Sequence, residues 1–342
     1  MYENSEKKSK KLKRIFFYSN VKNKDLFYIQ QFYAIDINIL EKMGFEVFPT
    51  NKISDFFKFW KYSIGFFYFY KYSFFPALIS KFFLKKNYFT GGIDDFSSEN
   101  KEIFLRQKLF FFLSYLVSDK CIIVSNSDLN NIQRIYKNML QKKLVFSYHG
   151  ISIENFICSY SEYEQKEKMF TTVAWQGVKE NVIRKGIDKA LIIFSELVKT
   201  EQFKDYVFYI VGKCGEGSLY LKQLVNELNI SEYVFFTDEV TESDKISYLK
   251  KSRYYFQLSK YEGFGIAALE ALAAKAIVIH SGNGGLKDVV SEDGIIVSSD
   301  DTSETIYEKL LNYDTTIISK SQERILSNFT IKKRFEDFQT FF

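Results

Sequence analysis

Short apolar runs alternate with helix-type patterns through the second half of the sequence, and this alternation constrains the fold more than any other feature. Each run has the length of a buried strand, and most are followed by a segment whose apolar residues have helical spacing. We expect strands at 171–175, 207–211, 234–237, 254–258, 276–280 and 295–297. We expect helices at 187–198, 218–228, 243–251, 266–274 and 303–312. Strands separated by helices pair in parallel, so the pattern predicts a doubly wound α/β sheet.

The first half opens with a similar strand–helix–strand unit. Residues 14–19 and 45–49 have the pattern of buried strands, and a helix is expected at 28–43 between them. Further strands are expected at 121–125 and 144–146. This half therefore also predicts a Rossmann-like sheet.

The length of the chain, 342 residues, is enough for two domains at roughly 150 residues each. A polar and charged run at 158–168 is the expected linker. We predict two domains, at 14–155 and at 165–325. A final helix at 331–342 is expected to pack back on the first domain.

Composition excludes several classes of protein. Apolar residues make up 46% of the chain and charged residues 26%, so most of the chain is not intrinsically disordered. The three cysteines are far apart and only two histidines occur, which argues against a disulfide framework or a zinc site. This cysteine usage favours a reducing, cytoplasmic compartment, and we expect no signal peptide.

Charge is distributed unevenly along the chain. Residues 1–150 carry a net charge of +11, from 24 lysines and arginines against 13 aspartates and glutamates, and the remainder carries −6. A basic half beside an acidic half indicates an anionic partner for the basic half, such as a membrane surface or a nucleic acid. The basic residues match no recognition motif for nucleic acid, so we expect none as a partner.

An aromatic-rich segment at 56–89 lies within the basic half. It holds 17 aromatic residues among 34, together with six lysines. It contains no apolar run of the ~18–20 residues that a membrane-spanning helix needs. Two interpretations remain open: the aromatic side chains fill the core of the first domain, or they form an interfacial surface whose lysines pair with anionic lipid.

The clearest chemical signal is a loop before an expected helix, Tyr261–Glu270, with the sequence YEGFGIAALE. Its two glycines allow close approach of a ligand to the backbone, and the helix that starts near Ile266 directs free N–H groups toward that ligand. Glu262 in the loop and Glu270 in the helix supply carboxylates that accept hydrogen bonds from pairs of hydroxyls. By spacing alone the segment suits a polyol or pyrophosphate ligand, and the alternative is a simple turn with two solvated glutamates.

The wider sequence resembles the donor-site region of the retaining family 4 (group 1) glycosyltransferases, which have the GT-B fold. The segment EGFGIAALEALAAKAIVIHSGNGGLKDVV is similar to the family signature of two glutamates separated by seven residues, a strand and a Gly-Gly-Leu turn. The segments RKGIDKALIIFSELV, VFYIVGKC, VFFTDEV and YYFQLSKYEGFG occur in the family's order, and LVFSYHGISIENF is similar to its inter-domain segment. The resemblance covers residues 120–330 well and residues 1–120 weakly.

The resemblance implies that the domain at 14–155 binds the acceptor and the domain at 165–325 binds a nucleotide sugar, and it implies roles for individual residues. Glu262 would hold the hydroxyls of a donor sugar, and Glu270 would bind the ribose hydroxyls. Lys185 would neutralise the donor diphosphate and so stabilise the charge that builds up on the leaving group. The glycine loop after the strand at 207–211 would place Gly212 beside the donor. Backbone amides of the loop would contact the sugar and phosphate, and these belong to Gly263, Phe264, Gly265 and Ile266.

The sequence departs from the family pattern at two places. The usual arginine a few residues before Lys185 is absent, since the matching stretch reads WQG at 175–177. Arg184 or Lys179 are the candidates to replace it. No glycine occurs before Gly44, so the glycine-rich loop that normally follows the first strand is missing.

The acceptor side of the family site often carries a His-containing turn, and the matching stretch here is TGGIDD at 90–95. Asp94 in this stretch would orient or deprotonate an acceptor hydroxyl, or it forms an Asx turn or a helix cap. His280 ends a strand and His149 lies in a turn, and both are weaker candidates. Neither Asp94-Asp95 nor Asp300-Asp301 has a convincing magnesium context, so we expect no cofactor and no essential metal.

The expected function is that of a hexosyl-type, retaining glycosyltransferase. It would move a sugar from a nucleoside diphosphate to an acceptor hydroxyl in the assembly of surface polysaccharide or another glycoconjugate. Expected partners are the nucleotide sugar, a glycan or lipid-linked acceptor and an anionic membrane surface, with the protein peripheral on the inner face of that membrane. Two alternatives stay open: a catalytically weak GT-B subunit that binds glycan or a partner glycosyltransferase, and a sugar-nucleotide epimerase of similar fold.

Overall fold

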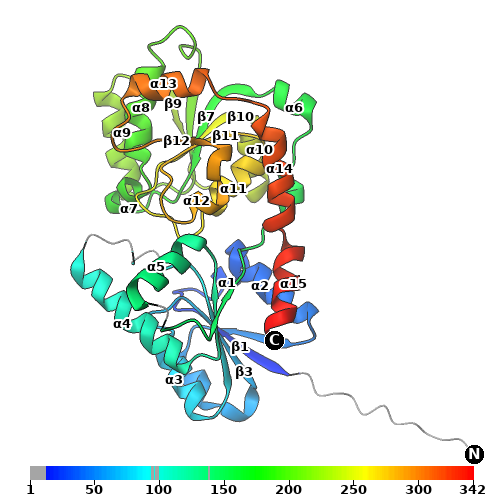
Figure 1. Cartoon of the computed structure of the whole chain (residues 1–342). Helices are drawn as coiled ribbons and strands as arrows, with labels where there is room; N and C mark the ends of the chain where they lie inside the picture. The colour runs from blue at the N-terminus through cyan, green and yellow to red at the C-terminus, as the bar shows by residue number, and fades with distance from the viewer. Residues whose placement is uncertain (1–12, 94–95, 97–99, 138) are drawn as a thin grey trace, which may run out of the picture. The chain divides into compact units, whose positions relative to one another are not determined.

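The computed structural model describes residues 13–93, 96, 100–137 and 139–342 (Figure 1). The chain divides into two compact units. The first comprises the chain up to Ile123 together with Gln133–Ser147 and Phe335–Phe342, and the second comprises Val124–Ile132 and Tyr148–Arg334. Each unit contains one sheet of six parallel strands covered by helices. The predicted α/β class with two doubly wound, Rossmann-like units is therefore confirmed, while the expected domain ranges stay predictions.

The sheet of the first unit has the strand order β2-β1-β3-β4-β5-β6. Its strands are β1 (Arg14–Tyr18), β2 (Glu46–Thr50), β3 (Ile64–Tyr68), β4 (Lys86–Thr90), β5 (Lys120–Ile123) and β6 (Leu144–Phe146). The helical segments of this part of the chain are α1 (Leu26–Ile29), α2 (Gln31–Lys42), η1 (Ile53–Phe57), η2 (Phe59–Lys61), α3 (Phe74–Phe82), α4 (Lys101–Val117) and α5 (Asn126–Tyr136). The last helix of the chain, α15 (Ile331–Phe341), adds its final residues to this unit.

Aromatic side chains fill both faces of this first sheet. Phe17 and Phe66 stack on one face with their ring centroids 5.2 Å apart, and Phe66 also contacts Phe338 of α15. On the other face, Phe67 contacts Phe56 and Phe89. Part of the aromatic-rich segment therefore forms core, because β3 is buried along its whole length between β1 and β4. Other aromatic residues of the segment are exposed.

The sheet of the second unit has the strand order β12-β11-β10-β7-β8-β9. Its strands are β7 (Glu167–Val173), β8 (Val207–Val211), β9 (Val234–Phe236), β10 (Ser252–Gln257), β11 (Ile277–His280) and β12 (Ile295–Ile296). The α-helices of this unit are α6 (Tyr160–Glu164), α7 (Lys179–Arg184), α8 (Ile187–Leu197), α9 (Glu216–Glu227), α10 (Glu242–Lys251), α11 (Ile266–Ala273), α12 (Leu286–Val289), α13 (Ser303–Leu311) and α14 (Ile317–Asn328). Two short 3-10 helices complete it, η4 (Ile153–Asn155) and η5 (Ser291–Asp293).

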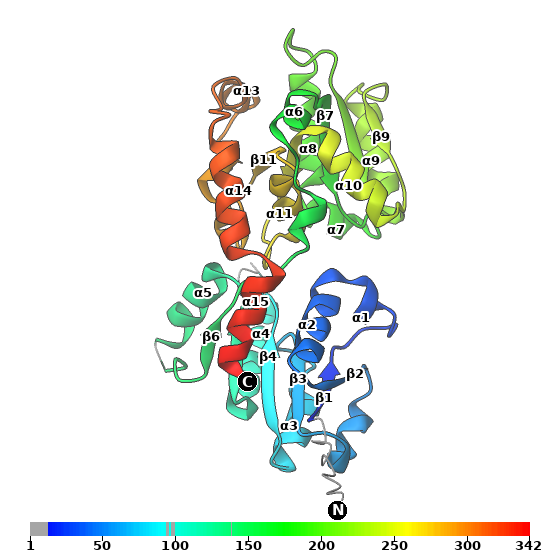
Figure 2. The same ribbon diagram turned by 90° about the vertical axis from the view of Figure 1, so that its right-hand side faces the viewer.

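Helices cover both faces of the second sheet. Figures 1 and 2 show α8, α9 and α13 on one side of the strands and α10, α11 and α14 on the other. A hydrophobic core lies on each face of the sheet, and successive residues of β10 contribute to one and then the other, because side chains along a strand alternate between faces. Tyr254 and Phe256 pack with the first group of helices, and Tyr255 packs with the second.

The polar run at 158–168 is not a simple linker, since it contains α6 and the first two residues of β7. Glu167 and Lys168 are exposed at the amino end of that strand, where polar side chains are tolerated. The polar residues that suggested a linker therefore belong to a short surface helix and to the amino end of a strand. Among the described residues, no helix has both the length and the apolar character needed to cross a bilayer.

Candidate functional site

The predicted donor-site residues lie at the carboxyl ends of the second unit's strands. β10 ends at Gln257 and leads through residues 258–265 into α11. α7 ends at Arg184 and α8 begins at Ile187, so Lys185 lies in the turn between these two helices. The carboxyl edge of a doubly wound sheet is where such folds bind ligands, because strand-to-helix loops and helix N-termini converge there.

Glu262 is the centre of a polar cluster at this edge. Its Oε2 atom lies 2.7 Å from the Nζ of Lys185 and accepts hydrogen bonds from Ser259 Oγ at 3.1 Å and Gln257 Nε2 at 3.3 Å. The structure thus brings together Glu262 and Lys185, which are 77 residues apart in the sequence. Three donors on one oxygen hold the carboxylate in place and leave the second oxygen for a ligand hydroxyl.

The position of Lys185 depends on the glycine that follows it. Gly186 has a φ of +70°, and a Cβ atom there would lie 2.1 Å from the carbonyl oxygen of Leu258. Only glycine allows the α7–α8 turn to lie this close to the loop after β10. Lys260 N donates to Arg184 O at 2.8 Å and joins the same two segments. The turn is therefore held against the loop that carries Glu262.

The Gly-Gly turn before α12 supports the Glu262 loop from another direction. Gly285 N donates to the carbonyl oxygen of Glu262 at 2.6 Å. A Cβ atom on Gly284 would lie 2.2 Å from that same oxygen, so the close approach requires glycine. Gly265 begins α11 with a φ of +99°, which turns the chain from the loop into the helix. The Phe264 side chain is buried, so only its backbone is available to a ligand.

Glu270 lies in α11 and is buried, with 2% of its surface exposed. Its Oε1 atom is 2.9 Å from Lys245 Nζ of α10, and Lys245 also pairs with Glu242 at 2.8 Å. Burial raises the pKa of Glu270 to about 7, although the neighbouring Lys245 ammonium acts to lower it. Burial acts to lower the pKa of Lys245, but its two carboxylate partners outweigh this effect and raise that pKa. The ammonium therefore keeps its proton while Glu270 titrates near neutral pH.

Tyr255 of β10 is buried, and its phenol interacts electrostatically with both carboxylates. Burial raises the pKa of its phenol, and the charges of Glu270 and Glu262 raise it further. Its hydroxyl donates to Gln257 Oε1 at 3.0 Å, and Gln257 in turn donates to Glu262. The hydrogen bonds from Tyr255 through Gln257 thus lead to Glu262, and the charge of Glu270 acts on the same phenol. The two predicted carboxylates therefore belong to one region of the sheet edge.

The remaining predicted donor residues lie around the ends of β7 and β8. Gly212 follows β8 with a φ of +131°, and a Cβ there would lie 2.3 Å from Ala174 O. Arg184 donates to Asn181 Oδ1 at 3.0 Å, and Asn181 Nδ2 donates to Trp175 O at 2.5 Å. Arg184 is thus linked to the stretch where the family arginine is missing. Lys179 instead lies over the ring of Tyr220, 4.2 Å from its centroid.

The acceptor-side residue predicted from the sequence, Asp94, lies outside the described residues. The two histidines are both buried. Burial lowers the pKa of His280 to about 4 and that of His149 well below its usual value. Within the described parts of the chain, no three His, Cys, Asp or Glu side chains gather as a metal site would require. The expected absence of an essential metal remains a prediction.

Sequence reasoning missed three residues of this region. Gln257 and Ser259 hold Glu262, and Lys245 holds Glu270. Gln257 and Ser259 gave a usable signal, because they are polar residues at the end of an apolar strand run that leads into the glycine loop. Lys245 gave none, since a lysine within an amphipathic helix is normally a solvated surface residue.

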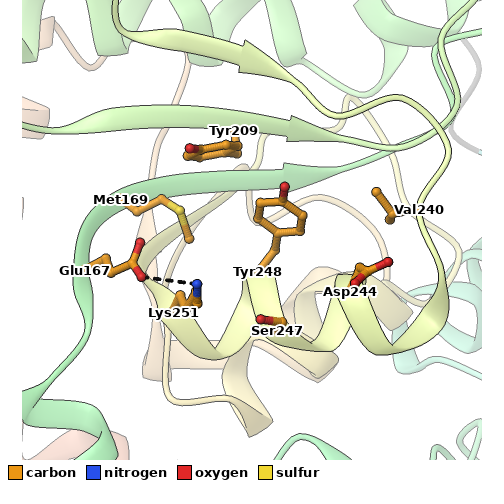
Figure 3. Close-up of a pocket in the computed structure, with 8 residues that line it drawn as sticks. All are labelled: Glu167, Met169, Tyr209, Val240, Asp244, Ser247, Tyr248 and Lys251. Carbon is orange, nitrogen blue, oxygen red and sulfur yellow. Dashed lines mark ion pairs between the residues drawn. The ribbon is translucent and has the colours of Figure 1, made fainter.

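A separate hollow lies beside α10 (Figure 3). None of the predicted site residues lines it, and the residues that do are Glu167, Met169, Tyr209, Val240, Asp244, Ser247, Tyr248 and Lys251. Its charged groups already have partners, since Glu167 pairs with Lys251 at 3.4 Å and Asp244 forms the N-terminal cap of α10 with Thr241. We therefore place the candidate site at the Glu262 cluster.

Comparison with known proteins agrees with this geometry. Residues 177–315 match the model of the family described as Glycosyl transferases group 1. The uncharacterized glycosyltransferase MJ1607 of Methanocaldococcus jannaschii is 26% identical over 211 residues, which are 59% of this chain and 51% of that protein. The alpha-monoglucosyldiacylglycerol synthase of Streptococcus pneumoniae is 25% identical over 46% of this chain and 36% of that protein. The O-antigen chain mannosyltransferase RfbU of Salmonella typhimurium is 24% identical over 58% of this chain and 53% of that protein.

The chain thus spans about half the length, or less, of these curated relatives. Among solved structures, Anabaena Alr3699/HepE in complex with UDP-glucose aligns with a TM-score of 0.74 at 15% identity, over 96% of this chain and 99% of that chain. At this identity the likeness shows the fold, which is GT-B. The family model supports a group 1 glycosyltransferase over residues 177–315, and the solved structures support the fold.

Proposed function

We propose that this protein is a hexosyl-type glycosyltransferase that uses a nucleoside-diphosphate sugar as donor. The observation that carries the proposal is the pairing of Lys185 with Glu262 in the loop after β10, followed in α11 by Glu270, which pairs with Lys245, inside the segment that matches the group 1 family. Carboxylates bind sugar and ribose hydroxyls, and an ammonium group binds a diphosphate. The cluster therefore combines the two chemistries that a nucleotide sugar requires.

Each residue has a proposed role in that reaction. Glu262 holds hydroxyls of the donor sugar, and Glu270 holds those of the ribose. Lys185 offsets the negative charge that grows on the nucleoside diphosphate as it leaves, and preorganised charge of this kind is usually the largest catalytic contribution. Arg184 is the proposed second cation, because its link through Asn181 places it beside the 175–177 stretch. The amides at the start of α11 and the loop at Gly212 complete the donor site.

The finer features of the reaction are part of the same proposal. We propose retention of anomeric configuration, as in the family 4 enzymes that the glutamate spacing resembles, and no essential metal. Asp94 is the proposed acceptor-side residue.

The acceptor is a glycan or lipid-linked glycan in surface polysaccharide or glycoconjugate assembly, a class supported by relatives named for O-antigen chain and glycolipid synthesis. A peripheral association with the inner face of a membrane is supported by the basic, aromatic first half.

Thermal unfolding with UDP, GDP, ADP, TDP and CMP tests the donor site. A nucleotide at 100 times its Kd stabilises the folded protein by about 2.7 kcal/mol, which shifts the unfolding midpoint measurably. We expect a shift with one nucleotide, and we expect Glu270→Ala to abolish it. Glu304→Ala is a matched control, because Glu304 lies at the start of α13 and has no proposed role. The shift of its unfolding midpoint with nucleotide should equal that of the wild type.

Turnover with the corresponding nucleotide sugar separates an enzyme from a binding subunit. We expect Lys185→Met to lower kcat by about 10²–10³ through loss of leaving-group stabilisation. The absence of a shift with any nucleotide would contradict the proposal and favour an accessory subunit. A nucleotide-dependent shift without transfer to any glycan, but with a rearranged free sugar as product, would favour an epimerase.

A further inference from the structure

Large apolar side chains are exposed on the first unit, on α3 and on the short segments that flank it in the sequence, and six of them define one surface. They are Phe59, Trp60, Phe75, Leu78, Phe82 and Leu84, and we call them the α3 surface. Trp60 is 68% exposed, Phe82 80% and Leu84 91%. Single exposed apolar side chains are common, but contiguous groups of large ones mark interaction surfaces.

Contacts between these residues show that the surface is continuous. Phe59 lies 5.3 Å from Trp60 and stacks on Phe83 with centroids 4.3 Å apart, and Phe83 lies 5.3 Å from Phe82. Along α3, the exposed residues have the spacing i, i+3 and i+7, which places them on one face of the helix. α4 packs against α3 (Figure 1) and reaches this face at Phe75, whose ring lies 6.0 Å from that of Phe110, but Phe75, Leu78 and Phe82 all remain exposed. The group therefore forms one apolar surface.

The segment that carries this surface also contains lysines and lacks acidic residues. Residues 56–93 contain six lysines and no aspartate or glutamate. Lys85 extends over the ring of Phe59, 6.0 Å from its centroid, so its charge lies at the apolar surface itself. Lys58 and Lys81 pair with acidic residues outside the segment. Within the described residues, Lys61, Lys85 and Lys86 form no ion pair, so their charges remain available to an anionic partner.

We infer that the α3 surface docks this protein on an anionic lipid bilayer. Aromatic rings favour the headgroup level of a bilayer, and lysines beside them attract anionic headgroups. A second copy of the chain is a poor occupant, because it would bring the same lysines into repulsion. A lipid bilayer supplies both an apolar environment for the exposed rings and negative charge for the lysines. The inference rests on the proposed membrane association but does not depend on the transferase activity.

Sedimentation of the full chain with vesicles tests the inference in the absence of nucleotide. Vesicles of phosphatidylcholine containing about one third phosphatidylglycerol are compared with vesicles of phosphatidylcholine alone. We expect binding to the anionic vesicles that weakens as salt is added, since screening reduces the attraction of the lysines. The neutral vesicles should bind at least about tenfold more weakly.

Three sets of substitutions identify the surface. The apolar set is Trp60→Ser, Phe82→Ser and Leu84→Ser, and the basic set is Lys61→Gln, Lys85→Gln and Lys86→Gln. A matched control set replaces exposed leucines of the second unit: Leu219→Ser, Leu311→Ser and Leu326→Ser. The basic set should lose roughly fivefold in affinity per lysine, and the apolar set at least about tenfold in total. The control set should bind like the wild type.

Several results would overturn the inference. These are no binding of the wild type to anionic vesicles, equal binding by the apolar and control sets, or a dimer of the wild type that the apolar set dissociates while vesicle binding is unchanged. Apart from the half-buried Lys85, all substituted side chains are exposed, so the unfolding midpoint should stay near the wild-type value and exclude misfolding as a cause. Vesicle binding without any nucleotide binding would refute the transferase and leave this inference intact.

Discussion

Glu270 is a buried carboxyl group whose protonation should couple to the stability of the fold. Its pKa is raised from 4.5 to about 7, so the folded protein binds this proton more tightly than the unfolded chain does. The resulting stabilisation is complete below pH 4.5 and is lost as pH rises through about 7. We expect this one group to remove about 3 kcal/mol of the free energy of unfolding across that interval.

Urea unfolding of wild type and Glu270→Gln at about pH 5 and about pH 8 measures this loss. The glutamine variant should lack the part of the pH dependence that comes from residue 270. Glu242→Gln is the matched control, because Glu242 pairs with the same Lys245 but is largely exposed. This control should keep the wild-type pH dependence, and parallel pH profiles for wild type and Glu270→Gln would contradict the assignment.

At the level of secondary-structure elements, the close packing of the α7–α8 turn leads to a testable prediction. Gly186→Ala places a Cβ atom against the backbone oxygen of Leu258, so α8 and the loop after β10 must separate. Gly44→Ala is the matched control, since Gly44 also has a positive φ, +86°, but a Cβ atom there would have no neighbouring atom within 4 Å. The control carries only the backbone cost of a left-handed residue, about 1–2 kcal/mol.

We expect Gly186→Ala to lose about 2 kcal/mol or more beyond this control, because the clash is with backbone that cannot rotate away. It should also weaken nucleotide binding, since Lys185 moves with the turn. Chemical denaturation of both variants measures the difference. Equal losses in the two variants would show that the close approach at Leu258 does not constrain the turn.

At the scale of the whole molecule, each unit has its own sheet and its own buried core. The chain has two tryptophans, Trp60 in the first unit and Trp175 in the second, so each unit carries its own fluorescent reporter. In Trp175→Phe the signal comes from the first unit, and in Trp60→Phe it comes from the second. Units with separate cores need not unfold in one cooperative transition.

We expect nucleotide to shift the denaturation curve of Trp60→Phe by about 2.7 kcal/mol at 100 times Kd, and that of Trp175→Phe by much less. The reason is that all proposed donor-site side chains with described positions belong to the second unit. Fluorescence of the two variants during urea unfolding, with and without nucleotide, gives both values. Equal shifts would mean that the two units unfold together.

The sequence by itself determined the fold class and the location of the loop that we propose for the donor site. The second unit could be predicted because its apolar runs and helical spacings alternate at the periods of buried strands and helices. Gly263 and Gly265 marked the loop in the sequence, because glycines between an expected strand and an expected helix allow a turn and the close approach of a ligand. These are local properties, and a single sequence records them directly.

The tertiary structure alone decided the partners of each functional side chain. The ion pairs from Lys185 to Glu262 and from Lys245 to Glu270 join residues 77 and 25 positions apart, and no local pattern reports such distances. It also divided the aromatic-rich segment, because β3 lies between β1 and β4 and buries its rings, whereas Trp60 and Phe82 remain exposed. Composition gives every phenylalanine the same preference for burial, and only the packing of the sheet against its helices determines which ones are covered.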